Sequence, residues 1–344
     1  MKLKLGSLFD GIGGWPLAAN KYGINPVWAS EIETFPIAVT EKHFPSMEQL
    51  GDITSINGAD IEPVDIICMG SPCQDLSIAG KRKGLSGARS GLFMDAVRII
   101  REMREVTNGK YPKFVVWENV PGAFSSNKGN DFRAVLEEIT ESSIPMPKSG
   151  RWAKSGMVRS SGCEVAWRVL DAQYWGVPQR RKRIFLVADF RGGCAAEILF
   201  KPESLSGYPA AGGITRTRIA GNTQNSIGKT VVAIDHAITT GGNCTAQGPC
   251  VKENGPMWTL KASGVHAVCA ICLNDQGGQS INVGYKVRRL TPTECERLQG
   301  LPDGYTLIND KKCSNSAIYK ALGNGMAQPC ADFVIRRIAE VLNK

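Results

Sequence analysis

A cysteine and a carboxylate each follow a buried-looking apolar run, and both could take part in covalent chemistry. Cys73 comes just after the run 64–69, in Gly-Ser-Pro-Cys-Gln, and Glu118 directly follows the run 114–117. A thiolate is a strong nucleophile, and basic residues nearby (Lys81, Arg82, Lys83 and Arg89) would favour the ionised thiol. A carboxyl with a raised pKa could donate a proton to a ring nitrogen. The alternatives are an inert buried cysteine and a glutamate that caps a helix or forms an ion pair.

A glycine-rich turn near the N-terminus could hold a nucleoside ligand. The segment 9–14 reads Phe-Asp-Gly-Ile-Gly-Gly and follows the first apolar run. Glycines there allow a ligand close to the backbone. Glu31 stands where an acidic residue accepts hydrogen bonds from ribose hydroxyls in Rossmann-like folds. The dinucleotide fingerprint needs a further glycine where this chain has Pro16, so a ligand without a pyrophosphate fits better. The alternative is a plain strand-to-helix turn.

Three further motifs are weaker when each is taken alone. Asp52 stands where a third strand should end and could accept a bond from an adenine amino group, or cap a helix. The run 179–183, Gln-Arg-Arg-Lys-Arg, is by default a solvated basic turn or a phosphate contact. Gly-Asn-Gly at 323–325 could close a ligand pocket or be only a turn.

The elements that must position these residues alternate between strands and helices. Apolar runs at 3–8, 27–30, 64–69, 114–117 and 184–188 read as strands, and stretches such as 92–106 read as amphipathic helices. This alternation predicts an α/β fold with a mostly parallel sheet covered on both faces.

Two other stretches differ from this pattern, and the α/β character returns at the end of the chain. From 191 to 284 the chain is rich in Gly, Thr, Ser and Asn and has almost no helical periodicity, which predicts a second, irregular, strand-rich domain. The stretch 145–162 is expected to be a long surface loop, and 330–342 a helix.

Composition narrows the class of protein and its location. The formal net charge of +9 favours a polyanionic partner, although a merely basic surface would give the same number. Eleven scattered cysteines without an export-signal pattern indicate reduced thiols and a cytoplasmic protein. No apolar run reaches the ~18 residues of a membrane span, so no membrane association is expected.

Taken together and in this order, the motifs resemble the cytosine-5 DNA methyltransferase family of bacteria and phages. The resemblance covers roughly residues 3–190 and 286–344. Besides the motifs above, it rests on Pro-Cys-Gln at 72–74, Glu-Asn-Val at 118–120, Arg-Leu-Thr-Pro at 289–292 with Glu294, and Gln-Gly at 299–300.

The resemblance implies a role for each matching residue. Cys73 would attack carbon 6 of cytosine, and Glu118 would contact ring nitrogen N3. Arg183 would hold the base at its carbonyl, Arg181 would order the site, and Asn119 would support the loop geometry. The cofactor would be S-adenosyl-L-methionine, with a pocket lined by Phe9, Gly11, Ile12, Gly13, Gly14, Glu31, Ile32, Asp52, Ile53, Pro72, Leu92 and Asn324.

Two positions depart from the family pattern. Ile32 stands where a tryptophan that stacks on adenine is common, so an apolar contact with less stacking is expected. Gly325 stands where a serine is common, which puts one cofactor hydrogen bond in doubt.

The resemblance also implies an organisation and a partner. A Rossmann-like catalytic and cofactor-binding domain would span 1–190, a target-recognition domain 191–317, and a segment 318–344 would complete the catalytic domain. Thr259-Leu260 would correspond to a Thr-Leu pair that the family often carries in its variable domain. The partner would be double-stranded DNA, with the target base flipped out of the helix. A monomer without an obligatory protein partner is expected, belonging to a restriction-modification system.

Three alternatives stay open at this point. A tRNA methyltransferase of the same family would share the catalytic motifs, but its typical Cys-Phe-Thr signature is missing from residues 191–320. A DNA-binding relative without activity would be expected to lack Cys73 or Glu118. Cys244, Cys250, Cys269 and Cys272 could bind zinc, but the spacing of the first pair is too wide for a usual knuckle, and no metal is expected.

Overall fold

The computed structural model describes residues 2–72, 91–200, 231–234, 251–253, 267–274, 282–308 and 314–343. Between 231 and 289 only the backbone of the strands is described. Cys73, the basic residues of 81–89 and Thr259-Leu260 lie outside these ranges.

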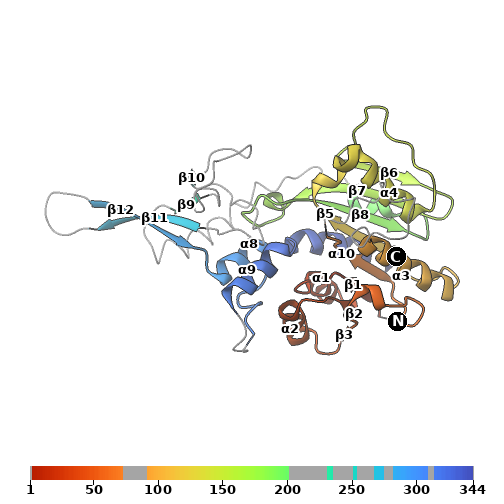
Figure 1. Ribbon diagram of the computed structural model, residues 1–344, viewed down its shortest axis with the longest axis horizontal. Coiled ribbons are helices and arrows are strands. Elements are labelled where there is room, and N and C mark those ends of the chain that lie inside the picture. Colours follow the sequence, from red (N-terminus) through yellow and green to blue (C-terminus); the bar gives the residue numbers. More distant parts are fainter. Residues whose placement is uncertain are drawn as a thin grey trace. The chain divides into compact units, whose positions relative to one another are not determined.

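An eight-stranded sheet forms the larger part of the fold (Figure 1). Its strand order is β3-β2-β1-β4-β5-β8-β7-β6. The first five strands in this order pair in parallel, whereas β8 runs antiparallel to β5, and β6 antiparallel to β7. This is the mostly parallel α/β sheet that the sequence predicts. The strands are β1 (Lys4–Leu8), β2 (Asn25–Ser30), β3 (Glu48–Gln49), β4 (Ile66–Met69), β5 (Phe114–Asn119), β6 (Ser155–Arg159), β7 (Glu164–Asp171) and β8 (Lys182–Asp189).

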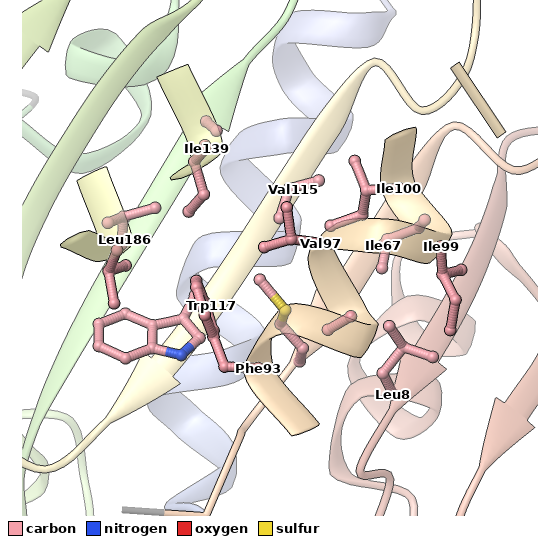
Figure 2. Close-up of a cluster of buried hydrophobic side chains, with 14 of the residues drawn as sticks. Leu8, Ile67, Phe93, Val97, Ile99, Ile100, Val115, Trp117, Ile139 and Leu186 are labelled. Atoms are coloured by element: carbon pink, nitrogen blue, oxygen red, sulfur yellow. The ribbon is translucent and has the colours of Figure 1, made fainter. Parts of the chain in front are cut away.

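Helices α3 (Gly91–Val106) and α4 (Asn130–Thr140) cover one face of this sheet. The buried residues of α3 recur three and four positions apart, as Phe93, Val97 and Ile100 show, and form one apolar stripe. Figure 2 shows this stripe against Val115 and Trp117 of β5. Every residue of β4 is buried, as expected for a parallel strand covered on both faces.

The opposite face of the sheet is covered by α1 (Gly14–Lys21) and α10 (Gln328–Leu342). Trp15 of α1 lies edge-on to Phe185 of β8, with ring centroids 6.2 Å apart. Lys21 of α1 forms a 2.5 Å ion pair with Asp332 of α10. The end of the chain is thereby tied to its beginning. Helix α2 (Thr34–His43) connects β2 to β3.

The chain divides into two compact units. The first holds Met1–Leu170, Lys182–Ser206 and Ala331–Lys344, and the second holds Asp171–Arg181 and Gly207–Cys330. The second unit contains a four-stranded sheet of order β10-β9-β11-β12, in which neighbouring strands pair antiparallel. The functional division of the chain at 190 and 317 stays a prediction. The elements of the second unit are β9 (Val231–Ile234), β10 (Val251–Glu253), β11 (Ala267–Asn274), β12 (Asn282–Arg289), α8 (Pro292–Gln299) and α9 (Asn315–Asn324).

Three local expectations were wrong. The stretch 145–162 contains strand β6, because Ser155–Arg159 pairs with β7 and is not free loop. Strand β3 ends at Gln49, three residues before Asp52, and Asp52 instead precedes a 3₁₀ turn, Ile53–Ser55. Helix α5 (Ala195–Phe200) lies in the stretch expected to be almost free of helix. In the described part of the chain, no helix has the length and apolar character needed to cross a membrane.

Candidate active site

The register of the parallel strands brings four predicted motifs to one edge of the sheet. Leu8 pairs with Ser30 and with Met69, and Met69 pairs with Trp117. The residues that follow these positions therefore leave the sheet at the same level. The chain also changes direction across the sheet between β1 and β4, since β2 lies on one side of β1 and β4 on the other. In open α/β sheets, ligands bind outside the carboxyl ends of strands at such a point.

The glycine turn after β1 is held by Glu31. Gly11 adopts φ +58° and Gly13 φ +80°, both in the left-handed region. The Gly11 N–H donates to Glu31 Oε2 at 2.8 Å. Phe9 also has a positive φ, 57°, which costs a bulky residue on the order of 1–3 kcal/mol. Phe9 is thus held in a conformation that a bulky residue does not favour, whereas the two glycines adopt theirs readily.

Glu31 keeps room for one further hydrogen bond. Besides Gly11, its carboxylate accepts from the backbone N–H groups of Ile32 (2.8 Å) and Glu33 (3.0 Å). A carboxylate offers about four acceptor positions, so about one stays open to a ligand hydroxyl. Beside it, Ile32 is 70% exposed, more than any other large apolar residue that the structure describes. The pair suits a ligand with a hydroxylated ring and an apolar flat ring.

Asp10 is a buried carboxyl in the glycine turn that sequence reasoning passed over. It is 5% exposed, and Ser7 Oγ lies 2.5 Å from its Oδ1. Its other oxygen, Oδ2, has no hydrogen-bond partner among the described residues. Burial, with a smaller contribution from the nearby charge of Glu31, raises the pKa of Asp10 to about 7. The signal that could have found it is an acidic residue between a buried strand and a buried helix start.

The other predicted cofactor residues of the first unit differ in exposure. Ile12 and Gly14 are buried at the start of α1, and Leu92 of α3 packs against the core. Ile53 is 4% exposed, whereas Pro72 is exposed.

Asp52 behaves as a turn cap. It is exposed and accepts from the backbone N–H and the hydroxyl of Thr54, both at 2.9 Å. These bonds lower the pKa of Asp52. A ligand contact by Asp52 stays a prediction.

A buried serine connects the turn after β4 to the end of β5. Trp117 Nε1 donates to Ser71 Oγ at 3.1 Å, and Asn119 Nδ2 donates to the Ser71 carbonyl at 3.0 Å. Asn119 Oδ1 in turn accepts from the Val120 N–H at 2.8 Å. Since Pro72 follows Ser71 directly, these bonds fix the point at which the chain leaves β4 toward Cys73.

Glu118 forms an ion pair at the same edge. Its Oε1 lies 3.0 Å from Arg183 Nε, and the two side chains are only 14% and 17% exposed. A Cβ added to Gly70 would lie 3.5 Å from Glu118 Oε2, so the carboxylate sits close to the turn after β4. The structure therefore brings together Glu118, Arg183 and the turn that leads to Cys73.

Arg181 is buried in the second unit and is not a solvated turn residue. It is 2% exposed and donates to the carbonyl oxygens of Gly323, at 3.0 Å, and Gly325. Gln179 donates to the Leu298 carbonyl at 3.0 Å. Arg181 thus holds the turn that carries Asn324, whose side chain is exposed.

The described residues contain no group of three or more His, Cys, Asp or Glu side chains that could hold a metal ion. The zinc hypothesis concerns other residues: Cys244 and Cys250 lie outside the described ranges, and the side chains of Cys269 and Cys272 are not described.

Comparison with known proteins decides the family. The family model described as C-5 cytosine-specific DNA methylase matches residues 3–143 and 154–340. The chain belongs to this family. It is 29% identical over 356 residues to the Type II methyltransferase M.HhaI of Haemophilus parahaemolyticus, covering 99% of this chain and 95% of that protein.

Two further comparisons show other proteins that this chain resembles. An Escherichia phage P1 protein named DNA N-6-adenine-methyltransferase is 27% identical over 470 residues, but this chain spans only 62% of its length. The fold matches the crystal structure of the S. pombe Dnmt2 methyltransferase with a TM-score of 0.66 at 16% identity, covering all of both chains.

The enzyme is therefore a cytosine C5 methyltransferase, and its cofactor is S-adenosyl-L-methionine. The open acceptor position of Glu31 and the exposed Ile32 fit the ribose and adenine of that molecule. When bound, the cofactor supplies a methyl group on a positively charged sulfur.

Proposed function

We propose that this enzyme methylates carbon 5 of cytosine in a specific sequence of duplex DNA, with Cys73 as its nucleophile. Carbon 5 is a poor nucleophile in the aromatic ring. Addition of the Cys73 thiolate forms a bond from sulfur to carbon 6 and moves the electron pair of the double bond into the ring. Carbon 5 then resembles that of an enamine and can take the methyl group. Loss of its proton restores the double bond and returns the electron pair to the Cys73 sulfur.

Glu118 and Arg183 act on the polar edge of the same ring. Glu118 contacts N3 and supports the addition by protonating or hydrogen-bonding it, since charge develops there as the thiolate adds. Arg183 holds the carbonyl of the base, and its ion pair orients the carboxylate of Glu118.

The single observation that supports this proposal best is the arrangement at the end of β5. The Glu118–Arg183 pair stands on the strand end that Asn119 and Trp117 tie to Ser71, two residues before Cys73. One strand end thus organises both the acid and the start of the nucleophile's turn. Access to a base in duplex DNA requires that the base leave the helix stack.

The first experiment measures transfer of labelled methyl to mixed-sequence duplex DNA and to tRNA in parallel, with nucleoside analysis of the product. Label in DNA as 5-methylcytosine is expected. Label in tRNA alone would contradict the choice of duplex DNA and favour the RNA-modifying alternative.

The second experiment tests the nucleophile. Cys73→Ser should abolish methyl transfer with cofactor affinity nearly unchanged. Cys194→Ser is the matched control, because Cys194 is a half-buried free thiol with a raised pKa at the start of α5. Duplex DNA carrying 5-fluorocytosine should also trap the wild-type enzyme covalently, since fluorine at carbon 5 leaves no proton to remove. Normal turnover of Cys73→Ser, or trapping of that variant, would remove the assignment.

A further inference from the structure

A stretch of the first unit carries basic residues and no acids. Between residues 142 and 163 the sequence has no Asp or Glu, yet it contains Lys148, Arg151, Lys154 and Arg159. Arg159 is used within the fold, since it pairs with the buried Glu164. The remaining three are exposed. The excess positive charge of this stretch is therefore displayed to solvent.

Trp152 anchors this stretch to the beginning of α4. Its Nε1 donates to the Gly129 carbonyl at 2.8 Å, and its ring stands edge-on to those of Phe132 (5.2 Å) and Trp167 (5.8 Å). Lys128 precedes Gly129 directly, and Arg151 precedes Trp152. Because consecutive Cα atoms are about 3.8 Å apart, this anchor brings Lys128 and Arg151 into one neighbourhood.

We call Lys128, Lys148, Arg151 and Lys154 the α4 basic patch. All four are exposed, and none has an ion-pair partner among the residues that the structure describes. Most arginines of this unit do have one: Arg98, Arg101 and Arg183 are examples.

The acidic residues of α4 are engaged in contacts within the fold. Glu137 accepts from the Ile144 N–H at 3.2 Å and pairs with Arg133. The one acid in the first turn of α4, Asp131, is 1% exposed and accepts from Ser126 Oγ at 2.5 Å. The acids Glu138 and Glu141 belong to the other end of α4, where both pair with Arg101.

The patch lies at the same edge of the sheet as Glu118. Strand β5 ends at Asn119, and the chain then forms two short turns, Pro121–Phe124 and Ser126–Gly129, before α4 begins at Asn130. The first turn of α4 thus stands at the carboxyl edge of the sheet, where Glu118 and Arg183 form their pair. A nucleic acid whose target base lies at Glu118 would extend over this region of the surface.

We propose that the α4 basic patch binds phosphates of the DNA duplex flanking the target cytosine. This rests on the proposed function, and it adds a contact surface outside the catalytic and cofactor motifs. Phosphate contacts of this kind carry no sequence information, but they set the position of the duplex and add affinity that depends on salt. Exposed, unpaired lysine and arginine side chains on a rigid platform suit this role.

The test compares two double variants of equal charge. Arg151→Gln with Lys154→Gln removes two charges from the patch. Lys2→Gln with Lys110→Gln removes two exposed charges next to the amino ends of β1 and β5, at the opposite edge of the sheet. The affinity of each protein for a mixed-sequence duplex is measured between 50 and 200 mM salt, and a thermal melt checks that each variant is folded.

Each phosphate contact contributes about 0.9 to the slope of log K against log salt. The patch variant should therefore show a slope shallower by up to about 1.8, while the control keeps the wild-type slope. A wild-type slope in the patch variant, or an equal loss in both variants, would overturn the patch while labelled DNA still upheld the proposed function. Methyl transfer to tRNA alone would overturn both, because the occupant would then not be duplex DNA.

Discussion

Replacement of Asp10 by asparagine should stabilise the enzyme at alkaline pH. Asparagine has nearly the same shape but cannot ionise. In the folded state the pKa of Asp10 is about 7, against an ordinary value of 3.8, because the carboxyl is buried and Ser7 gives it its one hydrogen bond in the described structure. The native state therefore holds a proton that the unfolded chain releases between these two values. The stability that this protonated carboxyl contributes is fully present below its ordinary pKa of 3.8. It is lost as the pH rises through its pKa in the folded state, about 7.

The size of the effect follows from the pKa difference. Each unit corresponds to 1.36 kcal/mol, so the buried charge costs on the order of 4 kcal/mol above pH 7. Between pH 5 and pH 8 the cost grows by about 2.7 kcal/mol, because it increases by 1.36 kcal/mol for each of the two pH units up to pH 7 and then levels off. Asp10 is only 5% exposed, so solvent screens little of this.

The assay is urea unfolding of wild type and Asp10→Asn at pH 5 and pH 8. Relative to wild type, the free energy of unfolding of Asp10→Asn should rise by about 2–3 kcal/mol from pH 5 to pH 8. Other groups cancel because they are common to both proteins. Asp52→Asn is the matched control, since hydrogen bonds from Thr54 lower the pKa of exposed Asp52. A lowered carboxyl pKa changes stability only below pH 5, so the difference between this variant and wild type should stay the same from pH 5 to pH 8.

A difference between wild type and Asp10→Asn that does not change with pH would refute the reasoning. It would mean that Asp10 is ionised in the folded protein at pH 5, and hence that its buried oxygen has a partner. A shift of the same sign in Asp52→Asn would point instead to a general effect of net charge.

Three further outcomes follow from the site. Glu31→Ala should weaken binding of S-adenosyl-L-methionine by about 10- to 100-fold in calorimetry, since hydrogen bonds to a charged group contribute about 1.5–3 kcal/mol. Unchanged affinity would show that Glu31 does not contact the ribose. Ser71→Ala should lower the free energy of unfolding by about 1–3 kcal/mol, because it leaves the Trp117 indole without its acceptor. Ser71→Thr keeps a hydroxyl and should therefore lose less of this stability. Arg181→Lys should lower the melting temperature and weaken cofactor binding together, since an ammonium does not reproduce the planar guanidinium, whose Nη2 reaches the carbonyls of both Gly323 and Gly325. Wild-type values for both would contradict the positioning role of Arg181.

The sequence predicted the elements whose signal is local. The apolar runs that became β1, β4, β5 and β8 were visible because strands buried on both faces are continuously apolar, whether they pair in parallel, as β1, β4 and β5 do, or not. Glu31 could be placed by its distance along the chain from Gly11, because one strand–helix–strand unit has a limited length.

What the sequence could not predict depends on neighbours distant in the chain. Arg181 reads as one of four basic residues in a row, and only its contacts some 140 positions later show that it is buried. Ser71 looks like an ordinary turn residue until β4 and β5 are paired, which brings Trp117 to it. Asp52 looked like the end of a strand, but its hydrogen bonds to Thr54 satisfy a local turn and ended the strand earlier.

The end of β5 both contacts Ser71 and positions Glu118, and it can do both because side chains alternate between the two faces of a strand. Successive side chains point to opposite faces, so Trp117 and Asn119 share one face and Glu118 has the other. The first two meet Ser71, and this leaves Glu118 free to face a different partner.

The register of β8 supplies that partner. Glu118 is paired directly with Phe185, and Arg183, two residues along, shares the face of Phe185. Diagonal neighbours at this spacing lie within reach of long side chains, and the 3.0 Å ion pair is the result. A shift of β8 by one residue would turn Arg183 to the opposite face and separate it from Glu118. The apolar core beneath resists this shift, because Ile184 and Leu186 are fully buried on the face that contacts α3 and α4. Packing of the core thus fixes the geometry of the acid, although no core residue touches it.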